Sequence, residues 1–361
     1  MKIVIFGLTI SSSWGNGHAT LWRGLVGNLL RQGHRVAFYE RDVFYYAAHR
    51  DLDSLPSGGE LRLYDDWQAI AFAARRELAD ADAALVTSYC PDGIAAAELV
   101  LSSAAKARIF YDLDTPITLA RLSAGESVDY IGPRGLQDFD LVLSYTGGTA
   151  LNELKHRLGA RRAEALYGSV DPDVHHPEAP LPHYRADLSH LGTYAEDRQS
   201  ALEALFVAPA RHLPGRRFVI GGAQYPADFP WAANIHFVRH LPPGEHAAFF
   251  SSSRWTLNVT RRSMAAMGFC PSGRMFEAAA CGAPLISDWW EGLDSLFEPG
   301  EEIVIARSSA DVVAALGMSD DERLALARRV RERVLAEHSA AKRAGELVAL
   351  VESVGSPVAA E

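Results

Sequence analysis

Short apolar runs alternate with helix-compatible segments along most of the chain, and this alternation limits the fold more than any other feature. In the first half the apolar runs occupy residues 2–10, 35–40, 83–87, 107–111 and 141–144. The segment from Ala19 to Gln32 carries leucine and valine at helical spacing and ends at Gly33, as a helix with a glycine C-cap does. Because strands that alternate with helices form parallel sheets covered on both faces, the sequence predicts an α/β fold.

A polar segment with several prolines, residues 167–184, interrupts this alternation. Beyond it, apolar runs return at residues 186–192, 216–222, 234–241, 254–259 and 283–288. A chain of 361 residues is long enough for two domains, each with its own core. We therefore expect one α/β domain over residues 1–166 and a second over residues 167–335.

The C-terminal region predicts helices. Ser319 and Glu322 have the spacing of a capping box. One face of the helix that follows carries Leu324, Ala327, Val330 and Val334. We expect residues 336–361 to form a last helix that packs back toward the N-terminal domain.

The composition, with 48% hydrophobic and 22% charged residues, is that of a soluble globular protein. No stretch approaches the roughly 18 uninterrupted apolar residues of a membrane span, and the opening MKIVIFGLTI is interpreted as a strand. A net charge of −10 argues against general nucleic-acid binding. The three cysteines lack CxxC spacing, which predicts neither disulfides nor a cysteine zinc site. These features favour a cytoplasmic protein.

The first apolar run leads into the glycine-containing stretch GNGHAT, residues 15–20, which precedes a helix. Backbone N–H groups at such a helix start can hold an anion. Gly15 and Gly17 have the G-x-G spacing of a dinucleotide fingerprint, but Thr20 stands where its third glycine would be. Glu40, at the end of the second strand, would then hold an adenosine ribose. By itself the stretch leaves open an NAD-dependent oxidoreductase, another anion-binding loop, and a turn without a ligand.

The C-terminal half predicts a stronger anion site, where a helix start and a strand end converge. Ser272 precedes a short helix, and the strand that follows the helix ends at Asp288. The free N–H groups after Ser272 suit a diphosphate, with Arg261 or Arg274 supplying positive charge. Glu277 suits the hydroxyls of a ribose, or alternatively pairs with Arg274 as an ordinary helix ion pair.

Eight stretches of the sequence, in order, resemble the CgeB-like (spore maturation protein type) glycosyltransferases of the GT-B class. They are SSSWGNGHATLWRGL, HRVAFYERD, IFYDLDTP, YGSVDPDVHHP, DLSHLGTYAEDRQ, RRFVIGGAQYP, LNVTRRSMAAMGFCPSGRMFEAAACGAPLISDWWEG and HSAAKRAGELV. The resemblance implies a GT-B fold, in which two Rossmann-like domains with parallel sheets face an interdomain cleft. It also implies a nucleoside diphosphate sugar as donor, held mainly by the second domain, with acceptor contacts mainly from the first.

The resemblance further implies the residues of the donor site. Glu277 would hold the ribose, and Ser272 with the adjoining N–H groups would hold the diphosphate. His240 and Leu241 would lie beside the base. The implied donor-binding set is Arg198, Gly221, Gly222, His240, Leu241, Asn258, Arg261, Ser272, Gly273, Arg274 and Glu277. Of these, Gly221 and Gly222 would let the nucleotide approach the backbone closely.

On the acceptor side, the resemblance implies that Asn16, Gly17, Thr115 and Asp288 face the transferred sugar or its acceptor.

His18 and Asp114 are the candidate catalytic residues, because either can accept a proton from the acceptor. Phe269 stands where many retaining GT-B enzymes have a second glutamate. Both inversion and retention remain open, and in retention the diphosphate itself would take the proton.

The hypothesis is therefore a metal-independent glycosyltransferase that uses a nucleoside diphosphate sugar and an unidentified acceptor. The alternatives are a nucleotide-sugar epimerase or hydrolase of GT-B type, and an NAD-dependent oxidoreductase. DLDTP, residues 112–116, fits a phosphatase nucleophile or a metal-binding D-x-D only weakly. His175 and His176 superficially resemble metal ligands, but their proline-rich surroundings favour a linker. Trp289 and Trp290 suit either ligand stacking or core packing.

Overall fold

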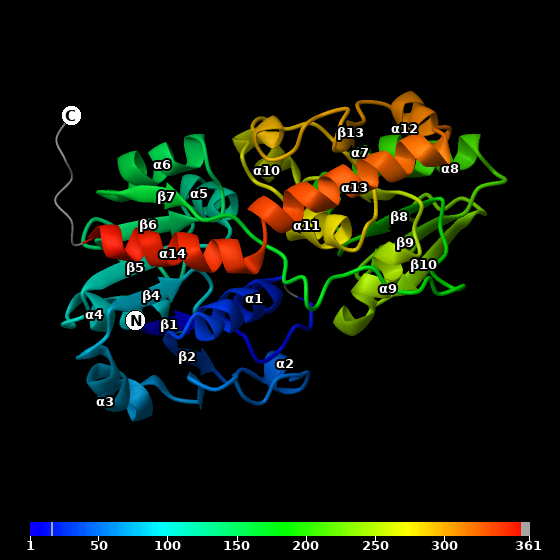
Figure 1. Ribbon diagram of the computed structural model, residues 1–361. Coiled ribbons are helices and arrows are strands. Elements are labelled where there is room, and N and C mark those ends of the chain that lie inside the picture. Colours follow the sequence, from blue (N-terminus) through cyan, green and yellow to red (C-terminus); the bar gives the residue numbers. More distant parts are fainter. Residues whose placement is uncertain (16, 355–361) are drawn as a thin grey trace. The chain divides into compact units, whose positions relative to one another are not determined.

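The computed structural model describes residues 1–15 and 17–354 and divides the chain into two compact units (Figure 1). Unit 1 comprises Met1–Gly168 and the C-terminal segment from Ala340 on, and unit 2 comprises Ser169–Ser339. Each unit contains one parallel sheet with helices, so the predicted α/β class is confirmed. Within the described residues, no helix is long and apolar enough to span a lipid bilayer.

The sheet of unit 1 has seven parallel strands in the order β3-β2-β1-β4-β5-β6-β7. These are β1 (Lys2–Gly7), β2 (Arg35–Arg41), β3 (Gly59–Tyr64), β4 (Ala83–Thr87), β5 (Ala107–Asp112), β6 (Leu141–Ser144) and β7 (Ala163–Ala165). The sequence analysis missed β3, whose exposed charged residues break the apolar run, and β7, which has only three residues. The strand order reverses between β1 and β4, and open α/β sheets bind ligands at such a reversal.

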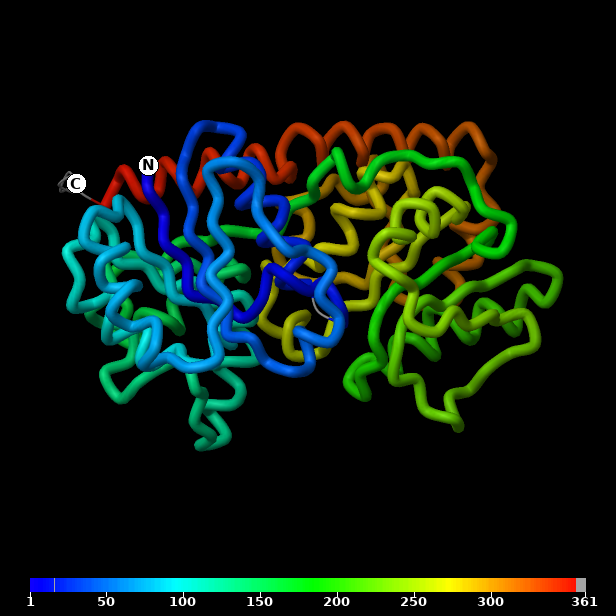
Figure 2. The backbone as a smooth tube through the Cα atoms, turned by 90° about the horizontal axis from the view of Figure 1, so that it is seen from below, coloured from blue at the N-terminus to red at the C-terminus, as the bar shows by residue number. Residues whose placement is uncertain are grey.

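The helices of unit 1 are α1 (His18–Arg31), α2 (Phe44–Ala47), α3 (Trp67–Leu78), α4 (Gly93–Leu101), α5 (Thr115–Ser123), α6 (Thr149–Leu158) and α14 (Ala340–Val354). The last of them, α14, packs against α1, and Figure 2 shows it in red beside the start of the chain. Leu347 and Val351 of α14 share a buried cluster with Trp22 and Leu25 of α1. The C-terminal helix therefore completes the core of unit 1.

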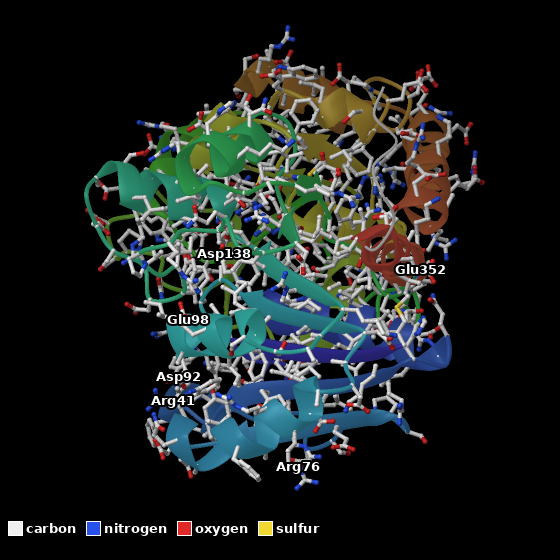
Figure 3. The ribbon with its side chains drawn as sticks, turned by 90° about the vertical axis from the view of Figure 1, so that its left-hand side faces the viewer. Arg41, Arg76, Asp92, Glu98, Asp138 and Glu352 are labelled. Carbon is white, nitrogen blue, oxygen red and sulfur yellow. The ribbon has the colours of Figure 1, made fainter. Side chains whose placement is uncertain are left out.

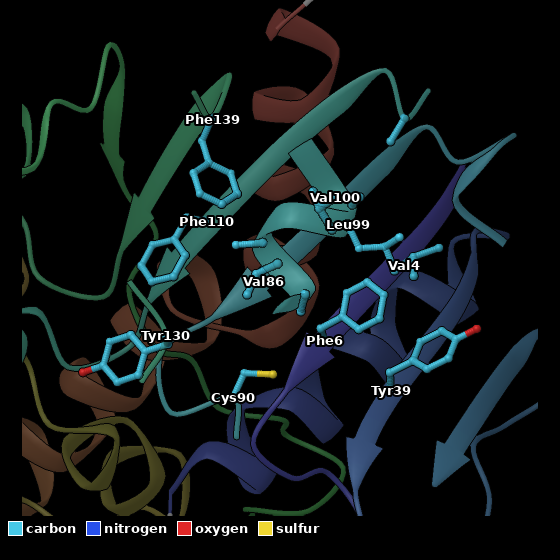
Figure 4. Packing of buried hydrophobic residues seen from close by; sticks show 14 of the residues in the cluster. Val4, Phe6, Tyr39, Val86, Cys90, Leu99, Val100, Phe110, Tyr130 and Phe139 are labelled. Carbon is cyan, nitrogen blue, oxygen red and sulfur yellow. The ribbon is translucent and has the colours of Figure 1, made fainter. Parts of the chain in front are cut away.

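Alternation along β1 divides the core of unit 1 into two layers. Ile3 and Ile5 point into the cluster that includes α1 and α14, whereas Val4 and Phe6 point into the cluster on the opposite face. The second cluster is shown in Figure 4, where aromatic rings cover the sheet. The Phe6 ring stacks on Tyr39 at 4.9 Å between centroids. Both faces of the strand are buried, which explains its continuous apolar run.

Polar contacts tie the carboxyl end of β2 to the start of α4. Arg41 Nη1 lies 3.2 Å from Asp92 Oδ1, and the two residues lie together in Figure 3. The Tyr64 hydroxyl donates to the other oxygen of the same carboxylate at 3.0 Å. These contacts hold the ends of β2 and β3 to the residue that precedes α4.

The sheet of unit 2 has six strands in the order β10-β9-β8-β11-β12-β13. They are β8 (Leu188–Leu191), β9 (Phe218–Gly222), β10 (Ile235–Arg239), β11 (Thr256–Asn258), β12 (Leu285–Ser287) and β13 (Ile303–Ile305). The helical elements are η1 (Glu196–Arg198), α7 (Gln199–Leu202), η2 (Glu203–Val207), α8 (Ala208–His212), η3 (Pro243–Glu245), α9 (His246–Ser251), α10 (Arg262–Met267), α11 (Gly273–Ala280), η4 (Leu293–Ser295), α12 (Ser309–Leu316) and α13 (Asp320–Glu337). Here the strand order reverses between β8 and β11.

Helix α13 begins with the predicted capping box, in which Ser319 and Glu322 each bond the other's backbone N–H. The predicted buried face is wrong at one position, because Leu324 is 43% exposed. The buried positions of α13 are Leu326, Ala327, Val330 and Val334. The buried stripe therefore includes Leu326, which the sequence analysis overlooked, in place of Leu324.

Glu40 shapes the loop that follows β1. Its buried carboxylate accepts hydrogen bonds from the backbone N–H groups of Ile10 at 2.7 Å and Ser11 at 2.9 Å. It also accepts from the hydroxyls of Thr9 at 2.8 Å and Ser11 at 2.6 Å. These four donors use the acceptor capacity of the carboxylate. The ribose-binding role that an NAD-dependent enzyme would give Glu40 is therefore wrong.

We expect Glu40→Gln to destabilise unit 1 by roughly 3 kcal/mol, because an amide nitrogen would face buried donors and leave them unsatisfied. Hydrogen exchange measured by NMR should accelerate at the amides of Ile10 and Ser11, which donate to this carboxylate. Glu60→Gln, on the exposed surface of β3, is the matched control. Unchanged exchange at both amides would contradict the assigned role of Glu40.

Candidate functional site

Basic residues gather where neighbouring strands of unit 2 end. Arg198 follows β8, Arg261 follows β11, and Arg274 lies in the first turn of α11. The carboxyl ends of parallel strands meet at one edge of a sheet, so these side chains approach one another. Their positive charges also interact, since Arg274 and Arg261 both lower the pKa of Arg198. The positive charge of Arg261 is partly compensated, because its Nε lies 3.2 Å from Asp197 Oδ2.

Arg198 is a half-buried cation whose Nε is buried. Burial in the first place, and then the neighbouring guanidinium groups, lower the pKa of Arg198 to about 10. Its Nη1 donates to the Thr193 carbonyl at 3.1 Å. Its Nε is buried and has no acceptor among the described residues. A half-buried cation with an unused donor and further cations beside it favours binding of an anion.

Two further buried polar atoms near this arginine lack partners among residues 1–15 and 17–354: His190 Nε2 and the Tyr225 hydroxyl. His190 Nδ1 lies 3.0 Å from the Leu257 carbonyl, which can only accept, so this nitrogen carries the proton. Burial, followed by the charge of Arg274, lowers the pKa of His190 to about 3, so the imidazole is neutral. Burial raises the pKa of Tyr225 to about 12, so its hydroxyl is a donor. Buried polar groups are normally satisfied, and these atoms together indicate a polar ligand.

A chain of contacts around Asn258 positions Arg274. Arg274 Nη1 donates to Asn258 Oδ1 at 3.4 Å. The amide nitrogen of Asn258 donates in turn to the hydroxyls of Thr260 and Ser287, each at 3.1 Å. Space for the guanidinium comes from Gly192, where an added Cβ would lie 2.8 Å from Arg274 Nη2. Asn258, predicted as a donor-site residue, therefore helps to position the Arg274 side chain.

Asp288 holds the loop after β11. Its carboxylate accepts from the backbone N–H of Thr260 at 3.0 Å and from the Thr260 hydroxyl at 2.9 Å. Burial raises the pKa of Asp288, and the hydrogen bonds to Thr260 oppose that shift. The structure thus gives this carboxylate a contact within the protein, which differs from its predicted contact with sugar or acceptor.

Close contacts within the protein explain the two glycines at the end of β9, Gly221 and Gly222. Gly222 has a φ of 152°, and a Cβ there would collide with the Gly192 carbonyl of the neighbouring loop. A Cβ on Gly221 would lie 3.0 Å from Leu191 Cδ1. What approaches these glycines closely is therefore the protein itself, whereas the sequence analysis expected the nucleotide.

His240 and Leu241, predicted beside the base, follow β10. The backbone N–H of His240 donates to the Gly222 carbonyl at 2.8 Å, and His240 has a φ of 52°. Leu241 is buried. Their backbone is thus tied to the end of β9, on the same edge of the sheet as Tyr225.

Helix α11 begins as predicted, with Ser272 at its N-cap and Gly273 as its first residue. Within the described residues the Ser272 side chain makes no capping hydrogen bond, so the first N–H groups of the helix are not capped by it. Glu277, one turn later, lies beside His175 and His246. The ring of Phe269 packs on Gly292.

Of the two tryptophans after β12, Trp290 is buried and Trp289 is 41% exposed. Core packing is therefore the role of Trp290.

In unit 1, His18 and Asp114 are brought together although they lie 96 positions apart. His18 begins α1 after the β1 loop, and Asp114 precedes α5 after β5. His18 Nε2 lies 3.2 Å from Asp114 Oδ2, and the His18 ring meets the edge of Tyr89 at 5.6 Å. Its Nδ1 is buried without a partner among the described residues. A carboxylate that accepts from one ring nitrogen leaves the other able to take a proton.

A second carboxylate, Asp112, is fully buried beside this pair. It accepts from the Asp114 backbone N–H and the Thr118 hydroxyl, each at 3.1 Å. Burial raises the pKa of Asp112 to about 6. Its Oδ2 has no partner in the described part of the chain. Asp112 is thus a further polar group that the sequence analysis did not count as functional.

The other predicted acceptor-side residues of unit 1 are Thr115, Gly17 and Asn16, and the first two differ in exposure. The Thr115 side chain is buried and its hydroxyl lies 2.7 Å from Ser144 Oγ, so the expected contact of Thr115 with sugar or acceptor is wrong. Gly17 is exposed at the N-cap of α1. The prediction for Asn16 falls outside the described residues.

The sequence analysis also missed His190 and Tyr225. His190 lies inside the short buried strand β8, where a histidine among apolar residues suggests core packing. Its place beside the reversal of strand order became visible only in the structure.

We expect Arg198→Met to raise the melting temperature of the ligand-free protein, because it removes a half-buried and incompletely paired charge. The same substitution should remove the stabilisation that inorganic pyrophosphate gives the wild-type protein. Thermal melting with and without pyrophosphate measures both effects. Arg211→Met, at an exposed arginine of α8, is the control. A lower melting temperature together with an unchanged pyrophosphate effect would contradict the assigned anion site.

Comparisons with known proteins bear on the family and the fold. Residues 198–349 match a family model described as "Glycosyl transferase-like". No curated protein sequence matches the chain.

Solved structures similar to this chain include sucrose-phosphate synthase from Thermosynechococcus elongatus, with 13% identity, a TM-score of 0.69, and coverage of 98% of this chain and 99% of that one. HepE from Anabaena, solved with UDP-glucose, has 12% identity, a TM-score of 0.64, and coverage of 98% and 100%. An alpha-glucosyltransferase, solved with UDP-glucose and DNA containing an abasic site, has 11% identity, a TM-score of 0.70, and coverage of 98% and 99%. The chain thus has the GT-B fold, and residues 198–349 match the glycosyl transferase-like model.

Proposed function

We propose that this glycosyltransferase-like enzyme transfers a sugar from a nucleoside diphosphate sugar to an acceptor hydroxyl, without requiring a metal. The observation that carries the proposal is the pair of buried, unpartnered donors on Arg198 and Tyr225 beside two more arginines. The resemblance to CgeB-like enzymes and the UDP-glucose in two similar structures support a sugar nucleotide as the ligand.

The reaction places negative charge on the departing diphosphate. Arg198, Arg261 and Arg274 lie at one edge of the sheet of unit 2, and their positive charge suits this leaving group. Loss of one well-placed donor of this kind typically raises the barrier by about 3 to 4 kcal/mol. In the proposal the uncapped N–H groups after Ser272 bind the diphosphate as well, and Glu277 binds the ribose hydroxyls.

The acceptor hydroxyl must lose a proton as its oxygen bonds to the sugar. In unit 1, Asp114 accepts a hydrogen bond from His18 Nε2–H, which leaves the lone pair on Nδ1. We assign His18 as the general base and Asp114 as the residue that orients its ring.

We expect a sugar nucleotide to raise the melting temperature of the wild type and to have a smaller effect on Glu277→Ala. A ligand at about 100 times its dissociation constant stabilises the folded protein by roughly 2.7 kcal/mol. The experiment compares UDP-, GDP-, dTDP- and CDP-sugars by thermal shift. Glu332→Ala, at an exposed glutamate of α13, is the matched control. Equal shifts in all three proteins would remove Glu277 from the donor site.

For His18→Ala we expect transfer to fall by about 10² to 10⁴-fold with the donor-induced thermal shift unchanged, because only proton removal is affected. His156→Ala, at an exposed histidine of α6, is the control. Product analysis by mass spectrometry and NMR measures the transfer and the configuration of the new bond. Release of free or epimerised sugar by the wild type, with no acceptor consumed, would show a hydrolase or epimerase instead. Full activity of His18→Ala would contradict its role as the general base and would leave the diphosphate as the group that takes the proton.

A further inference from the structure

Glu277 lies in a cluster with two histidines from distant parts of unit 2. His175 belongs to the proline-rich segment that precedes β8, and His246 begins α9. One side-chain ligand atom from each of the three residues lies within 4.8 Å of the others. His175 is only 3% exposed, which does not fit the solvated linker that its sequence surroundings favoured. The fold has therefore brought together two imidazoles and a carboxylate.

This set of donors matches the chemistry of a zinc site. Zn²⁺ binds imidazole nitrogen and carboxylate oxygen at about 2.0 to 2.2 Å, and three protein ligands leave a fourth position open. Tetrahedral bonds of that length place ligand atoms roughly 3.3 Å apart. The three ligand atoms lie within 4.8 Å of one another, so binding one ion requires them to move closer together.

The Glu277 carboxylate would balance part of the charge of an ion held by the two imidazoles.

The nearest thiol does not belong to the set. Cys281 follows Glu277 by one helical turn, but its Sγ is not among the ligand atoms that lie within 4.8 Å of one another. The expected ion is therefore one that nitrogen and oxygen donors hold.

We propose that His175, His246 and Glu277 bind a Zn²⁺ ion, and that this ion competes with the nucleotide donor for Glu277. Ion binding rests on the cluster alone, and only the competition rests on the proposed function. A zinc ion bound here would lower donor affinity, so the site acts as an inhibitory one in an enzyme whose transfer step needs no metal.

The first test measures Zn²⁺ binding to the full chain, freed of metal with a chelator, by calorimetry, and Co²⁺ binding by visible absorption. We expect one site, with affinity reduced at least about 10-fold in His175→Ala and in His246→Ala. Glu277→Gln, which preserves the side-chain shape, should weaken binding as well. His176→Ala, at the exposed neighbouring histidine, should leave binding unchanged. Absence of binding, or equal binding in all variants, would overturn the site.

The second test measures UDP binding with and without Zn²⁺, in the wild type and in His175→Ala. Zn²⁺ also binds phosphate in solution, so the comparison between the two proteins isolates the effect of the site. We expect Zn²⁺ to weaken UDP binding more in the wild type. Equal weakening, or tighter binding with Zn²⁺, would overturn the competition.

The two hypotheses can fail separately in this test. Zinc binding without UDP binding would leave the metal site and rule out uridine as the nucleoside of the proposed donor. UDP binding without zinc binding would leave the donor and remove the metal site.

Discussion

Positive charge held away from water is the constraint on which the site of unit 2 depends. Arg198 is half-buried, and the two nearby arginines make its charged form less favourable still. A fold tolerates such a group when something compensates its charge, and the unpartnered Nε of Arg198 indicates that this compensation is incomplete within the described residues. An anion bound there would relieve the repulsion between these arginines. This is the physical argument for the proposed diphosphate ligand.

The strand orders explain why the polar residues collect where they do. In unit 2 the order reverses between β8 and β11, and Arg198 and Arg261 follow these two strands. In unit 1 it reverses between β1 and β4, and the loops after them carry His18 and Tyr89. Loops that depart in opposite directions from adjacent strands leave space between them. Each unit thus places its functional candidates at the same position of its own sheet.

Much of the local structure around these residues serves to hold them. Glu40 organises the loop before His18, and Asp288 organises the loop before Arg261. Both carboxylates stand at or just after strand ends, where an acidic residue also suits a ligand hydroxyl. Their sequence positions alone do not separate the two roles, because the donors that satisfy them come from the neighbouring loop. Thr115 is a similar case, since its hydroxyl bonds Ser144 of the adjacent strand β6.

The sequence by itself determined the α/β class, the helix start at Ser272 and the capping box of α13, because apolar periodicity and capping are properties of nearby residues. It also pointed to Arg198 and Glu277 through a resemblance to known enzymes. Only the tertiary structure decided that His18 meets Asp114, that His190 and Tyr225 lack partners, and that His175, His246 and Glu277 share one cluster. Those contacts join residues tens of positions apart, and their geometry depends on strand order and loop path, which local patterns along the chain do not encode.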